Sequence, residues 1–261
     1  MKTRNLARPL QHGFSLIEMM LVVAIMGVIS AGILSQMNEA QQRGYSEQVK
    51  LDNFQEARDF VDQFFRDINQ IGYPSSRLVD TTSLTWAPAL TTQTTYAWAN
   101  TYIFDNRMAM GFVSIDANAV QFEGDMIGNG VVQSIIYKIN GSGSCLLCLQ
   151  RSQVDKISAD PLTGQATNWG TEVNDVLTNP IFSYFKADGT QIPNASLPID
   201  ISTSAGAQTL ASIKTIKISL TIRNNSVIDR KTSQAIETNF EGEVSINNCS
   251  MATTGQATSC Q

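Results

Sequence analysis

The longest apolar segment of the sequence lies near its N-terminus. Of the 21 residues from Phe14 to Leu34, Glu18 is the only charged one. At about 1.5 Å per residue, a helix over this segment is roughly 30 Å long, which is enough to cross the hydrocarbon core of a bilayer. The pattern therefore predicts a membrane helix over residues 14–36.

The pattern becomes amphipathic over residues 37–72, where a continuing helix is expected. Charged residues occupy most positions outside one apolar stripe. The apolar residues recur at steps of three and four, as on one face of a helix: Phe54, Ala57, Phe60, Val61, Phe64, Phe65, Ile68 and Ile71. A stripe of this kind predicts packing against a core. Gly72-Tyr73-Pro74 ends the helix, because proline disfavours helical conformation in the residue before it.

Beyond Pro74 the apolar residues follow the period of strands. Residues 73–130 are expected to form a variable loop region, with short strands near 110–113 and 119–122 framed by turn signals. Residues 131–261 are expected to form a β-sheet domain. Its clearest strand alternates Ile216, Ile218, Leu220 and Ile222 with polar residues. The predicted fold class is α+β, a long N-terminal helix packed on an antiparallel β-sheet.

The residues that precede the membrane helix indicate its orientation and processing. The first 13 residues carry three cations and no acid, which keeps residues 1–13 in the cytoplasm under the positive-inside rule: Lys2, Arg4 and Arg8. An ordinary signal peptide has its small-residue cleavage site after the apolar run, whereas Gly13 precedes it. Placing the Glu18 carboxylate within the lipid costs about 2.5 kcal/mol or more of free energy unless the carboxylate pairs with a cation. Cleavage after Gly13 would give Phe14 an α-amino group, the natural partner for Glu18 of a neighbouring subunit.

The segment Gly13-Phe14-Ser15-Leu16-Ile17-Glu18 resembles the leader of type IV prepilins and type II secretion pseudopilins. The resemblance implies cleavage between Gly13 and Phe14 by prepilin peptidase, N-methylation of Phe14, and a role for Glu18 in docking into a filament. It also implies a single-pass inner-membrane protein with its C-terminal domain in the periplasm, which later enters a cell-surface pilus. The implied partners are other pilin subunits and the inner-membrane assembly platform. An ordinary signal anchor with an incidental Glu18 is the alternative.

A second resemblance lies where the long helix ends. The nine residues from Arg66 to Pro74, RDINQIGYP, are similar to the segment that ends this helix in PilW-type minor pilins and J-type pseudopilins. The match is partial, because Asn69 replaces the usual Arg and Ile71 the usual Ala. It implies a minor pilin of a type IV pilus. A J-type minor pseudopilin of a type II secretion system, and a tip adhesin or other binding subunit, remain alternatives.

Composition argues against catalysis and nucleic-acid binding. Loss of residues 1–13 removes three positive charges and changes the formal charge from −5 to −8. The mature chain lacks the clustered Lys and Arg that phosphate binding needs. His12, the only histidine, leaves with the leader, which excludes Ser-His and Cys-His pairs and imidazole ligands. We therefore expect a protein that is not an enzyme and holds no cofactor or metal.

Four cysteines are the remaining candidate chemistry: Cys145, Cys148, Cys249 and Cys260. The predicted topology places them outside the cytoplasm, where disulfides persist. Zinc would require tighter spacing in the second pair, and a redox pair would favour a helix N-terminus. A Cys249–Cys260 disulfide is favoured, worth roughly 2–3 kcal/mol in the chain-entropy model. Cys145–Cys148 is then implied, and pairings that cross between the two regions are the alternative.

Overall fold

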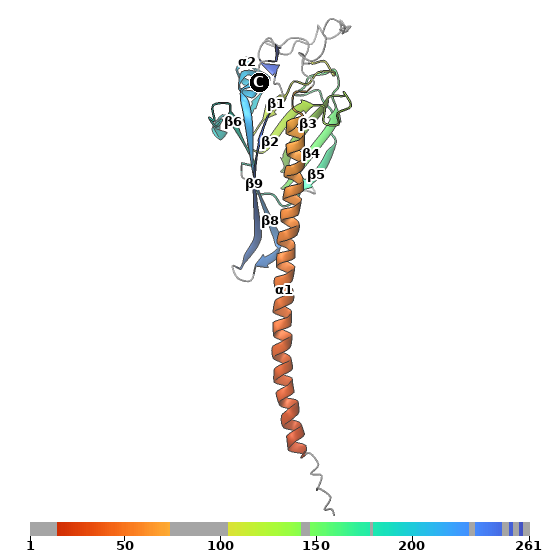
Figure 1. Ribbon diagram of the computed structural model, residues 1–261, viewed down its shortest axis with the longest axis vertical. Coiled ribbons are helices and arrows are strands. Elements are labelled where there is room, and N and C mark those ends of the chain that lie inside the picture. Colours follow the sequence, from red (N-terminus) through yellow and green to blue (C-terminus); the bar gives the residue numbers. More distant parts are fainter. Residues whose placement is uncertain are drawn as a thin grey trace, which may run out of the picture. The chain divides into compact units, whose positions relative to one another are not determined.

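The computed structural model describes residues 15–73, 104–141, 147–177, 180–229 and 233–246, with the short segments 251–252 and 256–257. The chain divides into two compact units, Met1–Gln48 and Val49–Gln261. Helix α1, Leu16–Asn69, begins in the first unit and ends in the second (Figure 1).

The described part of the first unit is the N-terminal part of α1, up to Gln48. Its side chains are exposed apart from those of Glu39 and Ser46, which are partly covered, and its most apolar 18-residue window has no buried residue. This part of the helix is long and apolar enough to cross a membrane. No tertiary contact covers these side chains in the described chain, so lipid or other proteins must cover them in the cell.

The second unit contains two antiparallel sheets. The first has six strands in the order β5-β4-β3-β2-β1-β7: Trp169–Val173, Cys148–Asp155, Gln133–Asn140, Ala119–Gly124, Phe112–Ile115 and Ile199–Asp200. The second has the order β6-β8-β9: Phe182–Lys186, Ile213–Asp229 and Gln234–Ser245. Two short strands form a separate pair, β10 (Met251–Ala252) and β11 (Gln256–Ala257). The short helix α2 (Ser204–Ala211) and the 3-10 turn Asn194–Ser196 lie between β6 and β8 in the sequence.

The last turns of α1 pack on both sheets (Figure 1). The ring of Phe64 lies 5.2 Å from that of Tyr137 on β3 and 5.5 Å from that of Phe182 on β6. Gly242 on β9 lets the helix approach closely, because a Cβ there would lie 2.8 Å from the ring of Phe65. The amphipathic stripe of α1 therefore lies at the centre of the core. Truncating Phe64 to alanine is expected to lower the free energy of unfolding by about 3–5 kcal/mol.

The β8–β9 hairpin extends beyond the part that β6 covers. Its outer section contributes Val227 and Ile236, which form a small buried cluster with Val49 of α1. Closer to the main core, the ring of Phe240 contacts that of Phe54 at 5.5 Å. The hairpin therefore supports the first helical turns of the second unit.

The fold class is α+β with a long helix on antiparallel sheets, as predicted, and several details differ. The described strands form two larger sheets and the separate β10-β11 pair, and not one sheet. Phe54, expected in the core stripe, is 45% exposed. The two short strands predicted near 110–113 and 119–122 are confirmed as β1 and β2, and both belong to the six-stranded sheet. Helix α2 was not predicted, because its eight residues are small and polar and its capping hydrogen bond, from Gly206 N–H to Thr203 Oγ1, is a weak signal in sequence.

Candidate functional site

Helix α1 begins with one half of a capping box. The backbone N–H of Ser15 donates a hydrogen bond of 3.0 Å to Oε2 of Glu18. The N–H of Met19 donates to the carbonyl oxygen of Ser15 at 3.2 Å, which closes the first helical turn. Ser15 thus stands at the N-cap and Glu18 at the third helical position, the Ser-x-x-Glu pattern that satisfies free N–H groups at a helix start. The pattern is present in the sequence as Ser15-Leu16-Ile17-Glu18 and was not among the predicted features.

The carboxylate of Glu18 is exposed and stands at the start of the helix. The nitrogen that it binds belongs to Ser15, which is joined directly to Phe14. Gly13 and Phe14 themselves lie outside the described residues, so cleavage and methylation there remain predictions. The second carboxylate oxygen, Oε1, accepts no hydrogen bond from a described residue. Glu18 can therefore cap its own helix with one oxygen and bind a further cation with the other.

Of the four cysteines for which disulfides were predicted, Cys148 lies within the described residues. Cys148 begins β4, is buried, and is disulfide-bonded. Its partner is one of the other three cysteines, all of which lie outside the described residues. The pairing of the four cysteines remains a prediction.

A buried polar centre joins the end of α1 to the six-stranded sheet. Oδ2 of Asp67 accepts hydrogen bonds from Tyr137 Oη at 2.6 Å and from Arg151 Nε at 2.8 Å, and Arg151 Nη2 lies 2.7 Å from the same oxygen. Gln63 Nε2 donates to Oδ1 of Asp67 at 2.7 Å. Burial, together with the negative charge of Asp67, raises the pKa of Tyr137 well above its usual range. The hydroxyl of Tyr137 therefore stays protonated and donates its hydrogen bond to Asp67.

A second buried ion pair joins β2, which carries Glu123, to Lys156, the residue directly after β4. Lys156 Nζ lies 2.7 Å from Oε2 of Glu123, and neither side chain is exposed to solvent. The same Oε2 accepts from the N–H of Met110 at 3.0 Å, and Lys156 also donates to the carbonyl oxygen of Met108 at 2.9 Å. Burial raises the pKa of Glu123 despite the adjacent ammonium group. The pair connects the segment before β1 to the core.

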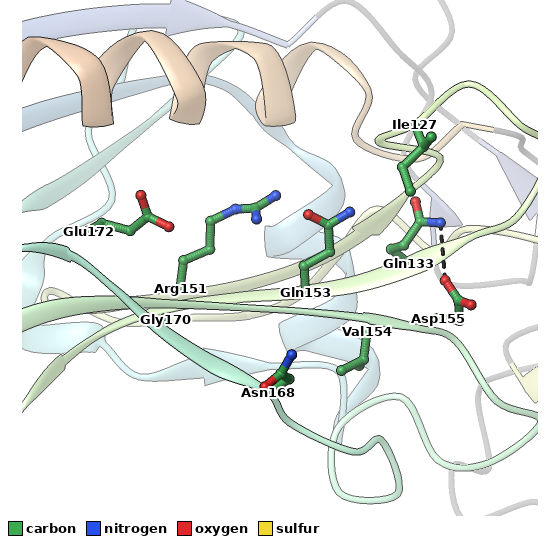
Figure 2. Close-up of a pocket in the computed structure, with 9 residues that line it drawn as sticks. All are labelled: Ile127, Gln133, Arg151, Gln153, Val154, Asp155, Asn168, Gly170 and Glu172. Atoms are coloured by element: carbon green, nitrogen blue, oxygen red, sulfur yellow. Dashed lines mark hydrogen bonds between the residues drawn. The ribbon is translucent and has the colours of Figure 1, made fainter.

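A pocket of about 540 Å³ opens beside β4 and β5. Figure 2 shows Gln133, Arg151, Gln153 and Glu172 projecting from the strands on the side where a helix crosses the sheet. The remaining lining residues are Ile127, Val154, Asp155, Asn168 and Gly170. Burial raises the pKa of Glu172, an effect that the charge of Arg151 partly opposes. The lining offers amides, carboxylates and a guanidinium group, which suits recognition of a polar or charged group.

The described residues contain no group of three or more His, Cys, Asp and Glu side chains that could hold a metal ion. The pocket and the two ion pairs were not predicted from the sequence. Asp67, Arg151, Glu123 and Lys156 are separated by dozens of residues, and a charged residue within an amphipathic pattern is ordinarily assigned to the solvent-facing side.

Comparison with known families identifies the N-terminal segment. Residues 8–34 match the prokaryotic N-terminal methylation motif. This motif is typical of type IV prepilin-like proteins of the pilin and pseudopilin superfamily, a structural and not a catalytic class. No curated protein and no solved structure matches the chain.

The motif and the fold agree on the class of protein. A long N-terminal helix packed against antiparallel sheets is a pilin-like α+β fold. The motif implies processing by prepilin peptidase and assembly partners of the pilus type. With the exposed apolar helix, it indicates a membrane-anchored prepilin that later joins a pilus or secretion apparatus.

Proposed function

We propose that this protein is a minor pilin, a low-copy structural subunit of a type IV pilus. The methylation motif over residues 8–34, leading directly into the exposed apolar part of α1, carries the proposal. A chain of 261 residues with two sheets is larger than typical major subunits, which favours an initiating or tip-proximal role. The protein is anchored in the inner membrane, with its C-terminal domain in the periplasm, until it is extracted into the fibre.

The assembly step uses apolar packing and one charge pair. Side chains of α1 that face lipid before assembly face neighbouring helices afterwards. Prepilin peptidase cleaves between Gly13 and Phe14, and the new amine of Phe14 is then N-methylated. The amine meets the Glu18 carboxylate of an adjacent subunit, which removes the cost of an unpaired charge in an apolar surrounding.

Three measurements test the proposal. Mass spectrometry of the mature chain should find an N-terminus at methylated Phe14, and the protein should co-purify with sheared surface pili. Glu18→Val should insert in the membrane normally but fail to enter fibres. The control is Glu39→Val, which removes an exposed acid that pairs with Arg43 on the same helix. An intact segment of residues 1–13 in the mature protein would contradict the proposal, as would normal incorporation of Glu18→Val.

The second candidate is a J-type minor pseudopilin of a type II secretion system. The partial match of residues 66–74 at the end of α1 supports both candidates equally. Deletion of the gene separates them: loss of surface pili with normal protein export supports the minor pilin, whereas loss of export with normal pili supports the pseudopilin. A tip adhesin would instead leave pili intact and reduce attachment to a surface.

A further inference from the structure

The turn between β2 and β3 contains the dipeptide Asn129-Gly130. An asparagine that precedes a glycine can lose ammonia when the backbone nitrogen of the glycine attacks the side-chain carbon Cγ. Glycine favours this attack because it has no side chain beside the attacking nitrogen. Gly130 has a φ of +81° and, like Asn129, is exposed, so water can reach both residues. The dipeptide therefore has the residue types and the exposure that the reaction needs.

Asp125 holds the nitrogen that would attack. The N–H of Gly130 donates a hydrogen bond of 2.7 Å to Oδ2 of Asp125. Oδ1 of the same carboxylate accepts from the N–H groups of Gly128 at 2.7 Å and of Asn129 at 3.2 Å. Asp125 is only 2% exposed, so the position of its carboxylate is fixed by these bonds. A carboxylate fixed on the proton of a nucleophile can act as its general base.

The side-chain carbonyl group of Asn129 is held by the same turn. The N–H of Val131 donates a hydrogen bond of 3.0 Å to Oδ1 of Asn129. This bond closes a ring of atoms that contains both Cγ of Asn129 and the nitrogen of Gly130, which keeps the two reacting atoms close. Negative charge develops on Oδ1 as Cγ becomes tetrahedral, and a backbone N–H directed at that oxygen stabilises the charge. The turn therefore activates the nucleophile and the electrophile together.

We propose that Asn129 is a site of intramolecular succinimide formation and deamidation, with Asp125 as the base. Asp125 accepts the proton of the Gly130 nitrogen while that nitrogen forms a bond to Cγ. The proton then passes to the side-chain nitrogen of Asn129, and the bond between Cγ and that nitrogen breaks to release ammonia. Water opens the resulting ring at either carbonyl group, which leaves aspartate or isoaspartate at position 129. The reaction needs water and no oxidant or reductant.

The reaction changes the charge and the backbone of the turn. Either product adds a negative charge, and isoaspartate also adds a methylene group to the main chain. The turn borders the end of α1, because the N–H of Asp125 donates to the carbonyl oxygen of Tyr73 at 2.8 Å. The modification therefore accumulates with time in this part of the second unit. It is independent of processing at Phe14 and of the proposed pilus function.

A second Asn-Gly dipeptide in the same chain provides an internal comparison. Asn140-Gly141 stands at the end of β3, where Asn140 pairs with Cys148 of β4. The carbonyl oxygen of Asn140 also accepts a hydrogen bond from the N–H of Leu147 at 2.9 Å. Strand pairing holds the backbone extended and opposes the rotation that ring closure requires. The fold should therefore slow the reaction at Asn140.

The test follows both dipeptides in the full chain in detergent at neutral pH, either folded or unfolded in guanidinium chloride. Trypsin cleaves after Lys138 and so places the two dipeptides on separate peptides. Mass spectrometry measures the loss of ammonia and the conversion to aspartate or isoaspartate. Folding should raise the rate at Asn129 by about 10²-fold, the lower end of what a positioned base contributes, and should lower the rate at Asn140.

Asp125→Asn removes the base and should lower the rate at Asn129 in the folded chain by about 10²-fold, without changing the rate at Asn140. The matched control is Asp116→Asn, whose carboxylate accepts the N–H of Ala117 at 2.7 Å in the turn between β1 and β2. This control should react at Asn129 as the wild type does.

The proposal is overturned if Asn129 reacts no faster in the folded chain than in guanidinium chloride. It is also overturned if folded Asp125→Asn and Asp116→Asn react at the same rate at Asn129. The first comparison uses the wild-type chain alone, so it decides the question even where Asp125→Asn folds poorly.

Discussion

The carboxylate of Asp67, on α1, lies 2.7 Å from Nη2 of Arg151, on β4, and only 3% and 13% of these two side chains are exposed. The pair joins the end of the long helix to the six-stranded sheet. Because Oδ2 of Asp67 also binds Tyr137, rotation or sliding of the helix would leave a buried charge without its partners. The polar centre therefore selects one register for α1 on the sheet.

Asp67→Asn should destabilise the second unit by about 3–5 kcal/mol, because it leaves the buried guanidinium of Arg151 without a counter-charge. Equilibrium urea unfolding of the full chain in detergent measures the loss. The control is Asp62→Asn on the same helix, whose exposed pair with Arg58 at 3.8 Å predicts a change below about 1 kcal/mol. Equal effects of the two substitutions would refute the role given to the polar centre.

The buried pair of Glu123 and Lys156 should behave differently from an exposed pair in a double-mutant cycle. Lys156→Met alone should cost about 3–5 kcal/mol, because Glu123 is left buried without its cation. Adding Glu123→Leu should recover a large part of that loss, since two apolar side chains need no counter-charge. The same cycle on the exposed pair of Lys217 and Glu241 should give a coupling of about 1 kcal/mol or less. An additive result at Glu123 and Lys156 would contradict this account.

Asp105 should contribute to stability at neutral pH and lose that contribution in acid. Burial alone would raise the pKa of Asp105, but hydrogen bonds from the side chain and backbone of Arg107 outweigh it and hold the pKa below its ordinary value of 3.8. The unfolded chain therefore takes up the proton first, and stability falls as the pH drops below about 3.8 towards the folded-state pKa.

Arg107→Gln tests this dependence. The variant should be less stable at neutral pH and should lose less further stability in acid, because the pKa of Asp105 is then closer in the folded and unfolded states. Thermal unfolding from neutral pH to about pH 2.5 measures both effects. Arg58→Gln, which changes an exposed arginine, should leave the pH profile unaltered. An acid limb of unchanged slope in Arg107→Gln would disprove the assignment to Asp105.

Glu172→Gln should stabilise the folded chain near neutral pH. Burial raises the pKa of Glu172 above its ordinary value of 4.5, so the unfolded chain releases this proton first as the pH rises. Ionisation therefore favours unfolding, an effect absent below the ordinary pKa and complete above the folded-state pKa. Glutamine does not ionise, so the melting temperatures of variant and wild type should converge in acid and separate at neutral pH. A variant that melts lower at neutral pH would show that Glu172 supports the fold instead.

Glu18→Gln separates the two roles of Glu18. Glutamine can accept the same hydrogen bond from the N–H of Ser15, so the capping hydrogen bond survives while the charge is lost. If the charge pair drives assembly, Glu18→Gln should enter sheared fibres as poorly as Glu18→Val, although its membrane insertion is normal. Quantitative immunoblotting of sheared fibres gives the comparison. Normal fibre incorporation of Glu18→Gln together with failure of Glu18→Val would assign the role to helix capping.

The features that could be predicted from the sequence are those that depend on neighbouring residues. The apolar run after Gly13 needs only its length and composition to be recognised, and the stripe around Phe60 and Phe64 needs only the period of a helix. The structure confirms a helix over both stretches, since α1 is continuous over Leu16–Asn69 and the rings of Phe60 and Phe64 are buried. That the first stretch crosses a membrane stays a prediction. Alternation in the Ile216 to Ile222 segment likewise identified the central strand β8 of the smaller sheet.

The features that could not be predicted depend on residues far apart in the chain. Nothing near Asp67 in the sequence distinguishes it from Asp59 or Asp62, yet its side chain is buried and theirs are exposed. Arg151 lies 84 residues away, and only the pairing of β3 with β4 places it beneath the helix. The division of the strands into two sheets has the same origin, because strand periodicity records which face is buried and not which strand is the neighbour.

By itself the sequence determined the long N-terminal helix, the methylation motif at its start and the α+β class, because each depends on the local order of apolar and charged residues. Only the tertiary structure decided that Asp67 meets Arg151, that Glu123 meets Lys156, and that a pocket opens beside β4 and β5. The physical reason is that burial and pairing of charges are properties of contacts between distant segments. Those contacts exist only after the helix and both sheets have packed together.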